Sequence, residues 1–396
     1  MPARALSRRL TAVIVVVCFA TIAVAAYLIW DAIIFHQVLN TDFAMHLRGV
    51  QRLLAGDYSL FGHFLFHALT AATATLLKLS AEKAAVLVMT GSSVASAAVI
   101  FGLYLSPMAE RRDLLLRLAL TISALVASAI FVPFFNRIYS GQSSPNVWHN
   151  PTNVLLKPLA LISAFYLERI GFTRAGLWPC LILIATIVAG ALTKPAFVLV
   201  LLPVLIFIII ATSLPPRWQF FPENYFNVDD RVRKILLSFS LLSIVLMAIQ
   251  GIYIFAVRRP DIHIVVAPFA VWSRTSPFIP LSILLAVAFP AAVTLLDWGR
   301  RICLEGLALA WAFLGVAFFV RSVFAETGDA MMHGNFGWPY QIALSVLFAF
   351  SVRSYYHQAV SADKGIGFWV TSGFLIGHVA SGFYYLYQLL ILGRYA

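Results

Sequence analysis

Apolar runs about 20 residues long follow one another along the whole chain, separated by short polar segments. Each run matches the ~30 Å hydrocarbon core of a bilayer, which an α-helix crosses in about 20 residues. The predicted spans lie near residues 10–34, 84–105, 114–134, 155–171, 176–193, 196–213, 235–256, 276–296, 302–321, 339–352 and 367–390. The pattern therefore predicts an all-α, polytopic membrane protein with about 11 transmembrane helices. With no large polar block between the spans, residues 1–396 form a single integral membrane domain.

One further apolar stretch, residues 62–79, is long enough to cross the bilayer but contains His63, His67 and Lys78. Lys and Arg concentrate in the cytoplasmic loops of membrane proteins. Most of the Lys and Arg fall on the cytoplasmic side if this stretch lies on the outer surface, whereas slightly more of them fall outside if it crosses. The first arrangement gives eleven spans, a cytoplasmic N-terminus and a first outer loop, residues 36–83, with interfacial helices. Twelve spans are the alternative.

The composition supports a membrane protein and argues against several other classes of protein. Hydrophobic residues make up 61% of the chain and charged residues only 11%, which is more apolar surface than a soluble domain can bury. Basic loops explain the net charge of +12, so nucleic-acid binding is not expected. Cys18, Cys180 and Cys303 lie within apolar runs, so neither a disulfide nor a zinc site is expected. Walker A, HExxH, GxSxG and GxGxxG motifs are absent from the sequence.

A carboxylate and a histidine, Asp42 and His46, stand just past the first predicted span in the sequence NTDFAMHLRG. Acidic side chains are costly in hydrocarbon, so an acid at the mouth of a membrane helix is a candidate functional group. Residues 43–54 have apolar and polar positions at helical spacing, as expected of a helix lying in the interface. Because Asp42 would precede that helix, capping its N-terminus is the structural alternative.

The second outer loop, residues 135–157, is rich in polar side chains. Its candidate substrate-binding residues are Asn146, Trp148, His149, Asn150 and Lys157. Asn and His hydrogen-bond polar ligands, Trp stacks on sugar rings, and Lys holds phosphate. An ordered turn is the alternative, because Ser144-Pro145 and Asn150-Pro151 both favour turns and Trp is common at membrane interfaces.

The third and fourth outer loops carry the remaining candidates, which are Arg258, Arg259, His263, Glu326, His333 and Asn335. Lys and Arg are more common in cytoplasmic loops than in outer loops, so two adjacent arginines on the outer side need another reason to be there. They are expected to bind a lipid phosphate or to pair with Asp261. The fourth loop is expected to contact carbohydrate or lipid phosphate, with a plain solvated loop as the alternative. A divalent cation stays open, although no pair of residues there has a strong ligand spacing.

Lys194 and Pro195 interrupt the apolar stretch over residues 177–210. A polar break of this kind either reaches a cavity or forms a tight turn between two spans. Both interpretations remain open from the sequence.

The order of these parts resembles the GT-C superfamily of membrane glycosyltransferases. Members have a first span, a large outer loop with an acid near its start, surface helices and then a run of spans. TDFAMH supplies the acid as Asp42, the run LRGVQRLLAGDYSLFGHFLFH resembles the surface helices, and residues 61–64 stand where many relatives have a His-Pro-Pro-Leu type sequence. The WHNPT and HGNFGW stretches look more like bacterial polysaccharide-assembly members. The second outer loop departs from several branches because it has no carboxylate, which puts a metal-dependent or two-acid mechanism in doubt.

The resemblance implies transfer of a sugar from a polyprenyl-phosphate carrier to a glycan, lipid or protein acceptor on the outer face. Asp42 would act as the general base, and Arg258, Arg259 and Lys157 would stabilise the departing phosphate. His46, His63 and the polar residues of the outer loops would contact the substrates. No nucleotide cofactor is required, the donor being a lipid-phosphate-linked sugar, and the expected location is the bacterial inner membrane, in contact with its lipids.

Two other functions stay open. The many spans also suit a transporter or flippase for lipid-linked or small polar solutes, although neither an internal repeat nor paired broken helices are evident. An O-antigen polymerase or ligase type enzyme also uses lipid-linked sugars, but a large outer loop late in the chain would be expected. An outer cavity centred on Asp42 would favour the transferase, and a midplane site open alternately to both sides would favour transport.

Overall fold

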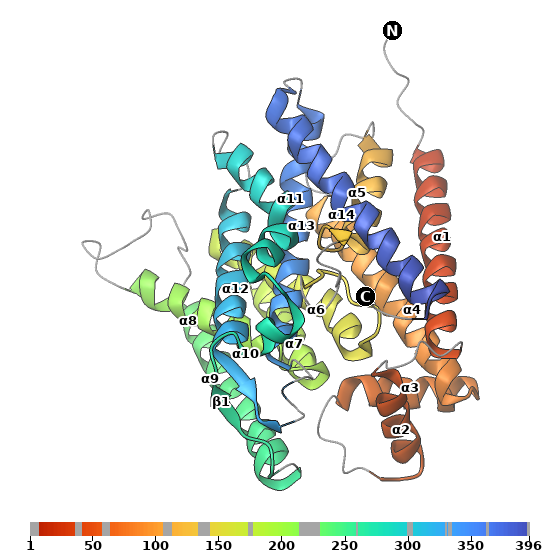
Figure 1. The fold of residues 1–396 in the computed structure, drawn as a ribbon, viewed down its shortest axis with the longest axis vertical. Helices are drawn as coiled ribbons and strands as arrows, with labels where there is room; N and C mark the ends of the chain where they lie inside the picture. Colours follow the sequence, from red (N-terminus) through yellow and green to blue (C-terminus); the bar gives the residue numbers. More distant parts are fainter. Residues whose placement is uncertain are drawn as a thin grey trace.

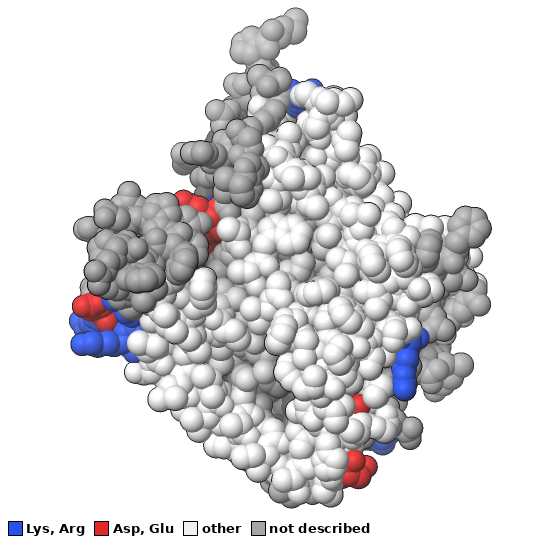
Figure 2. Space-filling model, turned by 60° about the vertical axis from the view of Figure 1, so that its left-hand side comes forward, with Lys and Arg blue, Asp and Glu red and all other residues white. Residues whose placement is uncertain are grey.

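The computed structural model describes residues 8–35, 42–57, 64–105, 113–133, 143–172, 177–213, 230–258, 260–298, 304–328, 331, 335–361 and 364–393. These residues form a bundle of helices, with α2, α3 and β1 at one end and the start of α1 at the other (Figure 1). Figure 2 shows one face of the molecule, on which the charged side chains lie near the margins of a broad uncharged surface. Such a surface is expected where lipid surrounds a protein.

The helices of the first half are α1 (Arg8–Phe35), α2 (Phe43–Leu54), α3 (Phe64–Leu77), α4 (Ala81–Val99), α5 (Leu114–Val126), α6 (Pro151–Phe172), α7 (Leu177–Thr193) and α8 (Val198–Ser213). The second half contains α9 (Asp230–Ile252), α10 (Ala270–Thr275), α11 (Ile279–Trp298), α12 (Leu304–Val323), α13 (Trp338–Val360) and α14 (Ile366–Ile391). Strands β1 (Ile264–Val266) and β2 (Phe324–Glu326) form an antiparallel pair in which Ile264 is opposite Glu326.

The prediction of a polytopic helical membrane protein is confirmed. Six helices in the described part of the chain are long and apolar enough to cross a membrane, namely those over 9–35, 81–104, 230–252, 279–297, 305–323 and 366–391. Helices α6 and α13 have similar lengths but more polar sequences. Whether the chain crosses eleven or twelve times stays a prediction.

Helices α2 and α3 lie across one end of the bundle (Figure 1). Helix α3 has 14 residues, or roughly 21 Å at 1.5 Å per residue, which is shorter than the hydrocarbon core. His46 and Val50 of α2 are buried, as are Phe66 and His67 of α3. The amphipathic helix α2 therefore packs against α3, with His46 beside His67.

Helix α5 is shorter than the predicted span over 114–134, because it ends at Val126. The chain then continues as an extended buried segment that hydrogen-bonds to two other helices. The Ser128 N–H donates to the His378 carbonyl at 3.0 Å, and the Ile130 N–H donates to the Leu285 carbonyl at 3.0 Å. Non-helical backbone is tolerated inside a membrane protein where neighbouring elements supply hydrogen bonds. Since those partners come from α11 and α14, an apolar pattern read locally cannot show the end of α5.

Helix α13 runs through the centre of the bundle and is buried along almost all of its length. It is longer than the predicted span over 339–352 because its last turns also pack against other helices. There, the Arg353 guanidinium forms a salt bridge of 2.6 Å with Glu168 of α6. The first turns of α6 and α13 lie at the opposite end of these helices, where the polar residues described next converge.

Candidate functional site

Asn150 lies at the centre of a polar cluster directly before α6. Its side-chain amide donates a hydrogen bond to the Asp42 carboxylate. Its side-chain oxygen accepts from the Lys194 amine at 3.4 Å and from the Asn153 backbone N–H at 2.9 Å. The last contact is an N-cap, which satisfies one of the free N–H groups in the first turn of the helix. Asn150 therefore begins α6 and joins an acid and an amine from distant parts of the sequence.

Asp42 occupies the N-cap position of α2, as the structural alternative predicts. Its side chain has no capping hydrogen bond to that helix, and its carboxylate accepts instead from Asn150. The Asp42 backbone N–H donates to the His149 carbonyl at 3.3 Å, which fixes the turn. Within the described residues, the second carboxylate oxygen of Asp42 has no hydrogen bond, and the residue is partly exposed. One oxygen is thus held in place and the other is available to a substrate.

Lys194 lies in the break between α7 and α8 and is only 6% exposed. Its amine lies 4.1 Å from the centre of the Trp338 ring, a cation–π contact. Burial lowers the pKa of the Lys194 amine to about 7, and the Asp42 carboxylate opposes this shift. Asn150 separates the two charges, so the ammonium is not neutralised by a direct ion pair in the described structure.

His149 completes the cluster and lies against α14. Its Nδ1 is 3.2 Å from the Tyr385 hydroxyl, and its ring centre is 5.9 Å from that of Trp338. Burial, followed by the charge of Lys194, lowers the pKa of His149 to about 3. The imidazole is therefore neutral at physiological pH and serves as a hydrogen-bonding group.

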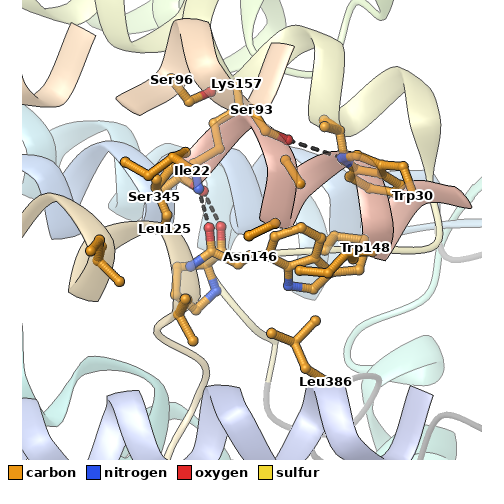
Figure 3. Close-up of a pocket in the computed structure, with 18 of the residues that line it drawn as sticks. Ile22, Trp30, Ser93, Ser96, Leu125, Asn146, Trp148, Lys157, Ser345 and Leu386 are labelled. Carbon is orange, nitrogen blue, oxygen red and sulfur yellow. Dashed lines mark hydrogen bonds between the residues drawn. The ribbon is translucent and has the colours of Figure 1, made fainter. Parts of the chain in front are cut away.

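A cavity of about 250 Å³ lies beside this cluster (Figure 3). Its walls come from α1, α4, α5, α6, α13, α14 and the segment before α6, and Asp42 is not among its lining residues. Trp148 and Trp30 both line it, with ring centres 5.3 Å apart. Phe43, next to Asp42 in the chain, packs against the same Trp30 ring at 5.8 Å. The cavity and the polar cluster are therefore neighbours that share an aromatic wall.

Asn146 and Lys157 lie in this cavity and not with Asp42. The Asn146 amide donates to the carbonyls of Ala124 at 3.0 Å and Ala127 at 2.6 Å, which are free at the end of α5. Its oxygen accepts from the Lys157 amine. The Asn146 side chain therefore links the end of α5 to α6, and its predicted contact with substrate stays a prediction.

The remaining predicted residues that the structure describes are not brought to the cluster. His46 is buried beside α3, with Nδ1 3.2 Å from Nε2 of His67. Glu326 is buried in a small pocket that Arg321 also lines, and accepts from the Asn335 amide at 2.8 Å. His263 is exposed on the β1 side. His63, Arg259, His333 and the Arg258 side chain lie outside the described residues.

No group of three or more His, Cys, Asp and Glu residues that could hold a metal ion occurs in the described ranges. The sequence left Lys194 open between a cavity residue and a turn residue, and it did not predict Trp338 or Tyr385 as members of this cluster. The only available signal was the Lys-Pro break in an apolar run, since a tryptophan or tyrosine in a membrane span is ordinary.

Comparison with solved structures shows a fold shared with the first of the two that follow. The crystal structure of ArnT from Cupriavidus metallidurans bound to undecaprenyl phosphate matches with a TM-score of 0.52 and 13% identity, over 96% of this chain and 76% of that one. AglB, the archaeal oligosaccharyltransferase from Archaeoglobus fulgidus in complex with an inhibitory peptide and a dolichol-phosphate, matches with a TM-score of 0.44 and 11% identity, over 96% and 56% of the two chains. No protein-family model matches the sequence, and no curated protein matches it.

Proposed function

From a fold that it shares with the GT-C membrane glycosyltransferase ArnT, we propose that this protein transfers a sugar from a polyprenyl-phosphate carrier to an acceptor hydroxyl. The reaction takes place at the α2–α3 end of the bundle, which we assign to the outer face of a bacterial inner membrane on the distribution of basic residues. The undecaprenyl phosphate bound by ArnT supports the class of donor.

One observation carries the proposal, namely that Asp42 and Lys194 are held by opposite ends of the Asn150 amide. Glycosyl transfer from a lipid phosphate needs a base for the acceptor hydroxyl and a positive charge for the departing phosphate. Two such groups in direct contact would neutralise each other. Separated by one amide, the two charges are held near each other without a direct ion pair.

The chemistry then follows from the charges. The acceptor hydroxyl gives its proton to the second carboxylate oxygen of Asp42, while the hydroxyl oxygen bonds to the anomeric carbon of the donor sugar. The bond from that carbon to the phosphate oxygen breaks, and the phosphate leaves with the electron pair. Lys194 balances the added charge, and the surrounding aromatic side chains make this attraction stronger than in water.

Lys194 takes the part that the sequence had given to Lys157, because Lys157 bonds to Asn146 in the neighbouring cavity. Contributions from Arg258 and Arg259 remain predictions. The Lys194 ammonium and the Asn150 amide supply electrostatic stabilisation, and the participation of a divalent cation stays open. The location of the acid and the amine at one end of the bundle supports the transferase over a transporter, whose site would lie near the midplane.

The test is transfer of radiolabelled sugar by the purified protein from a panel of polyprenyl-phosphate sugars to an acceptor extract. Asp42→Asn should lower the rate by about a hundredfold or more, the usual contribution of a general base. Asp57→Asn is the matched control, because Asp57 lies in the same region but its carboxylate is paired with Arg52 at 2.6 Å. Undiminished transfer by Asp42→Asn, or equal losses in both variants, would remove Asp42 as the base.

A further inference from the structure

A pair of buried histidines joins the surface helices α2 and α3. Nδ1 of His46 lies 3.2 Å from Nε2 of His67, and each residue is only 4% exposed. The Phe66 ring packs at a steep angle against both imidazoles, with ring centres 5.6 and 5.7 Å away. The α2 backbone comes so close at Gly49 that a Cβ there would lie 2.8 Å from Nε2 of His67. The two imidazoles therefore form a tightly packed joint between the helices.

Helix α2 depends on this joint for its place in the structure. It has 12 residues, a length at which an isolated helix is marginal in water. Its buried residues are Phe43, His46, Gly49 and Val50, so one narrow face holds it against the bundle. On that face, His46 supplies the side-chain hydrogen bond to α3.

The joint lies one helical turn from Asp42, the proposed base. The His46 backbone N–H donates to the Asp42 carbonyl at 3.1 Å, and the Asp42 N–H donates to the His149 carbonyl at 3.3 Å. The Asp42 carboxylate accepts from Asn150. Asp42 is thus held on one side by the segment before α6 and on the other by the first turn of α2. A shift of α2 would reach Asp42 through the backbone.

The contact between the two imidazoles depends on their protonation. One ring donates an N–H and the other accepts with a bare nitrogen, whereas a charged imidazole has an N–H at both nitrogens. If both rings are charged, the pair has no acceptor, and the two buried like charges repel. Histidine ordinarily changes charge near pH 6.5. The joint therefore holds while at least one ring is neutral and opens when both are charged.

Other charged groups lie on the elements around the joint. Helix α2 packs on α3 and α4 and touches α1 through Phe43, and α3 also packs on α6 and α7. The charged residues described on these helices or at their ends are Asp31, Asp42, Arg48, Arg52, Asp57, Lys78, Glu82, Lys83, Lys157, Glu168, Arg169 and Lys194. Arg52 pairs with Asp57, and Glu82 contacts Gln51 of α2 at 3.5 Å. Lysine and arginine are charged in acid, and carboxylates in general titrate roughly two pH units below imidazoles. As the pH falls from 7 to 5, the two imidazoles are therefore the first groups at the joint to gain an opposing charge.

We propose that His46 and His67 are positioning residues, which hold Asp42 toward Asn150 at neutral pH and release it in acid. The inference rests on the proposed function for the part played by Asp42, and on the joint alone for the movement of α2. Separated rings bind protons more readily than the joined pair. Each proton taken up on separation shifts the equilibrium about tenfold per pH unit below about 6.5, or about thirtyfold between pH 6.5 and pH 5.

Hydrogen–deuterium exchange of the purified full chain tests the joint without any substrate. The protection of residues 43–54, relative to the same residues in the unfolded chain at each pH, should fall by about tenfold or more from pH 7 to pH 5. The protection of α4 should not fall. In the double variant His46→Asn/His67→Gln, an amide replaces each interacting ring nitrogen and keeps the hydrogen bond without a titrating group, so the protection should no longer depend on pH. His357→Gln, in the last turn of α13, is the control and should behave as the wild type.

A glycine pair tests the joint without replacing a histidine. Gly49→Ala should displace the His67 ring and lower the protection of residues 43–54 already at pH 7, whereas Gly91→Ala, with nothing within 4 Å of its Cβ, should not. Equal wild-type protection of residues 43–54 at the two pH values, a parallel loss in α4, or undiminished acid sensitivity in the double variant would overturn the inference.

The initial rate of sugar transfer tests the link to Asp42. It should fall with the protection of α2 in the wild type and stay level in the double variant. His149 does not change charge in this range, because burial lowers its pKa to about 3. An equal acid loss of rate in both proteins would overturn the positioning of Asp42. Acid-sensitive protection without sugar transfer at any pH would count against the proposed function alone.

Discussion

Replacing Asn150 by alanine removes the four hydrogen bonds of its side chain, and two of these losses have separate consequences. Loss of the cap on the Asn153 N–H should destabilise α6 by about 1 kcal/mol. Loss of the bond to the Asp42 carboxylate releases the proposed base, and a hydrogen bond to a charged group is worth about 1.5 to 3 kcal/mol. If that energy holds the carboxylate in its reactive position, the transfer rate should fall about tenfold to a hundredfold.

Asn150→Ser separates the two effects, because serine is also a good N-cap residue but is too short to join Asp42 to Lys194. We expect Asn150→Ala to lower both thermal stability and the transfer rate. Asn150→Ser should keep stability near that of the wild type and lower the rate by a similar factor. Tryptophan-fluorescence melting and initial rates of sugar transfer measure the two properties on the same preparations. Asn150→Ser with the wild-type rate would refute the role of the amide bridge.

The remaining predictions concern pH and packing. Because burial and then Lys194 lower the pKa of His149 to about 3 from 6.5, the unfolded chain binds the proton more readily. The contribution of neutral His149 to the free energy of unfolding is therefore complete above pH 6.5 and is lost as the pH falls toward 3. His149→Gln should remove this dependence of the melting temperature on pH between 3 and 6.5. Because burial lowers the pKa of Lys194 to about 7, the rate of sugar transfer should decline as the pH rises through 7. Arginine stays protonated, so Lys194→Arg should move this decline to higher pH when initial rates are measured against pH. A Cβ on Gly382 would lie 1.9 Å from the Val126 carbonyl oxygen, whereas nothing lies within 4 Å of one on Gly373. Gly382→Ala should thus cost about 1 to 3 kcal/mol by overpacking and lower the melting temperature, while Gly373→Ala should not.

The helical spans are predictable because each is decided by its own residues. An uninterrupted apolar run such as that of α1 needs no partner to define it. The end of α5 at Val126 differs, because the extended segment after it is stable only through hydrogen bonds to α11 and α14. Those partners lie more than 150 positions further along the sequence. Local hydropathy gives no information about them.

The residues of the candidate site also differ in whether the local sequence can predict them. Asp42 is predicted as a site residue because it is an acid just past the first span, and His149 and Asn150 because they lie in a polar outer loop; the structure brings these three together. The density of polar residues could not separate Asn146, whose amide is used by the end of α5. The sequence also could not assign Lys194 to the site, because a lysine in an apolar run gives the same pattern whether it lies in a turn or in a functional site.

The most direct test of the account follows two atoms of one donor. A polyprenyl-phosphate sugar with carbon-14 in the sugar and phosphorus-32 in the phosphate is incubated with the purified protein and an acceptor extract. Cleavage at the anomeric carbon predicts that carbon-14 moves to the acceptor, phosphorus-32 stays with the polyprenyl lipid, and both events fail in Asp42→Asn. Joint movement of the two labels, or passage of the intact donor across a vesicle membrane without separation of the labels, would contradict glycosyl transfer by this site.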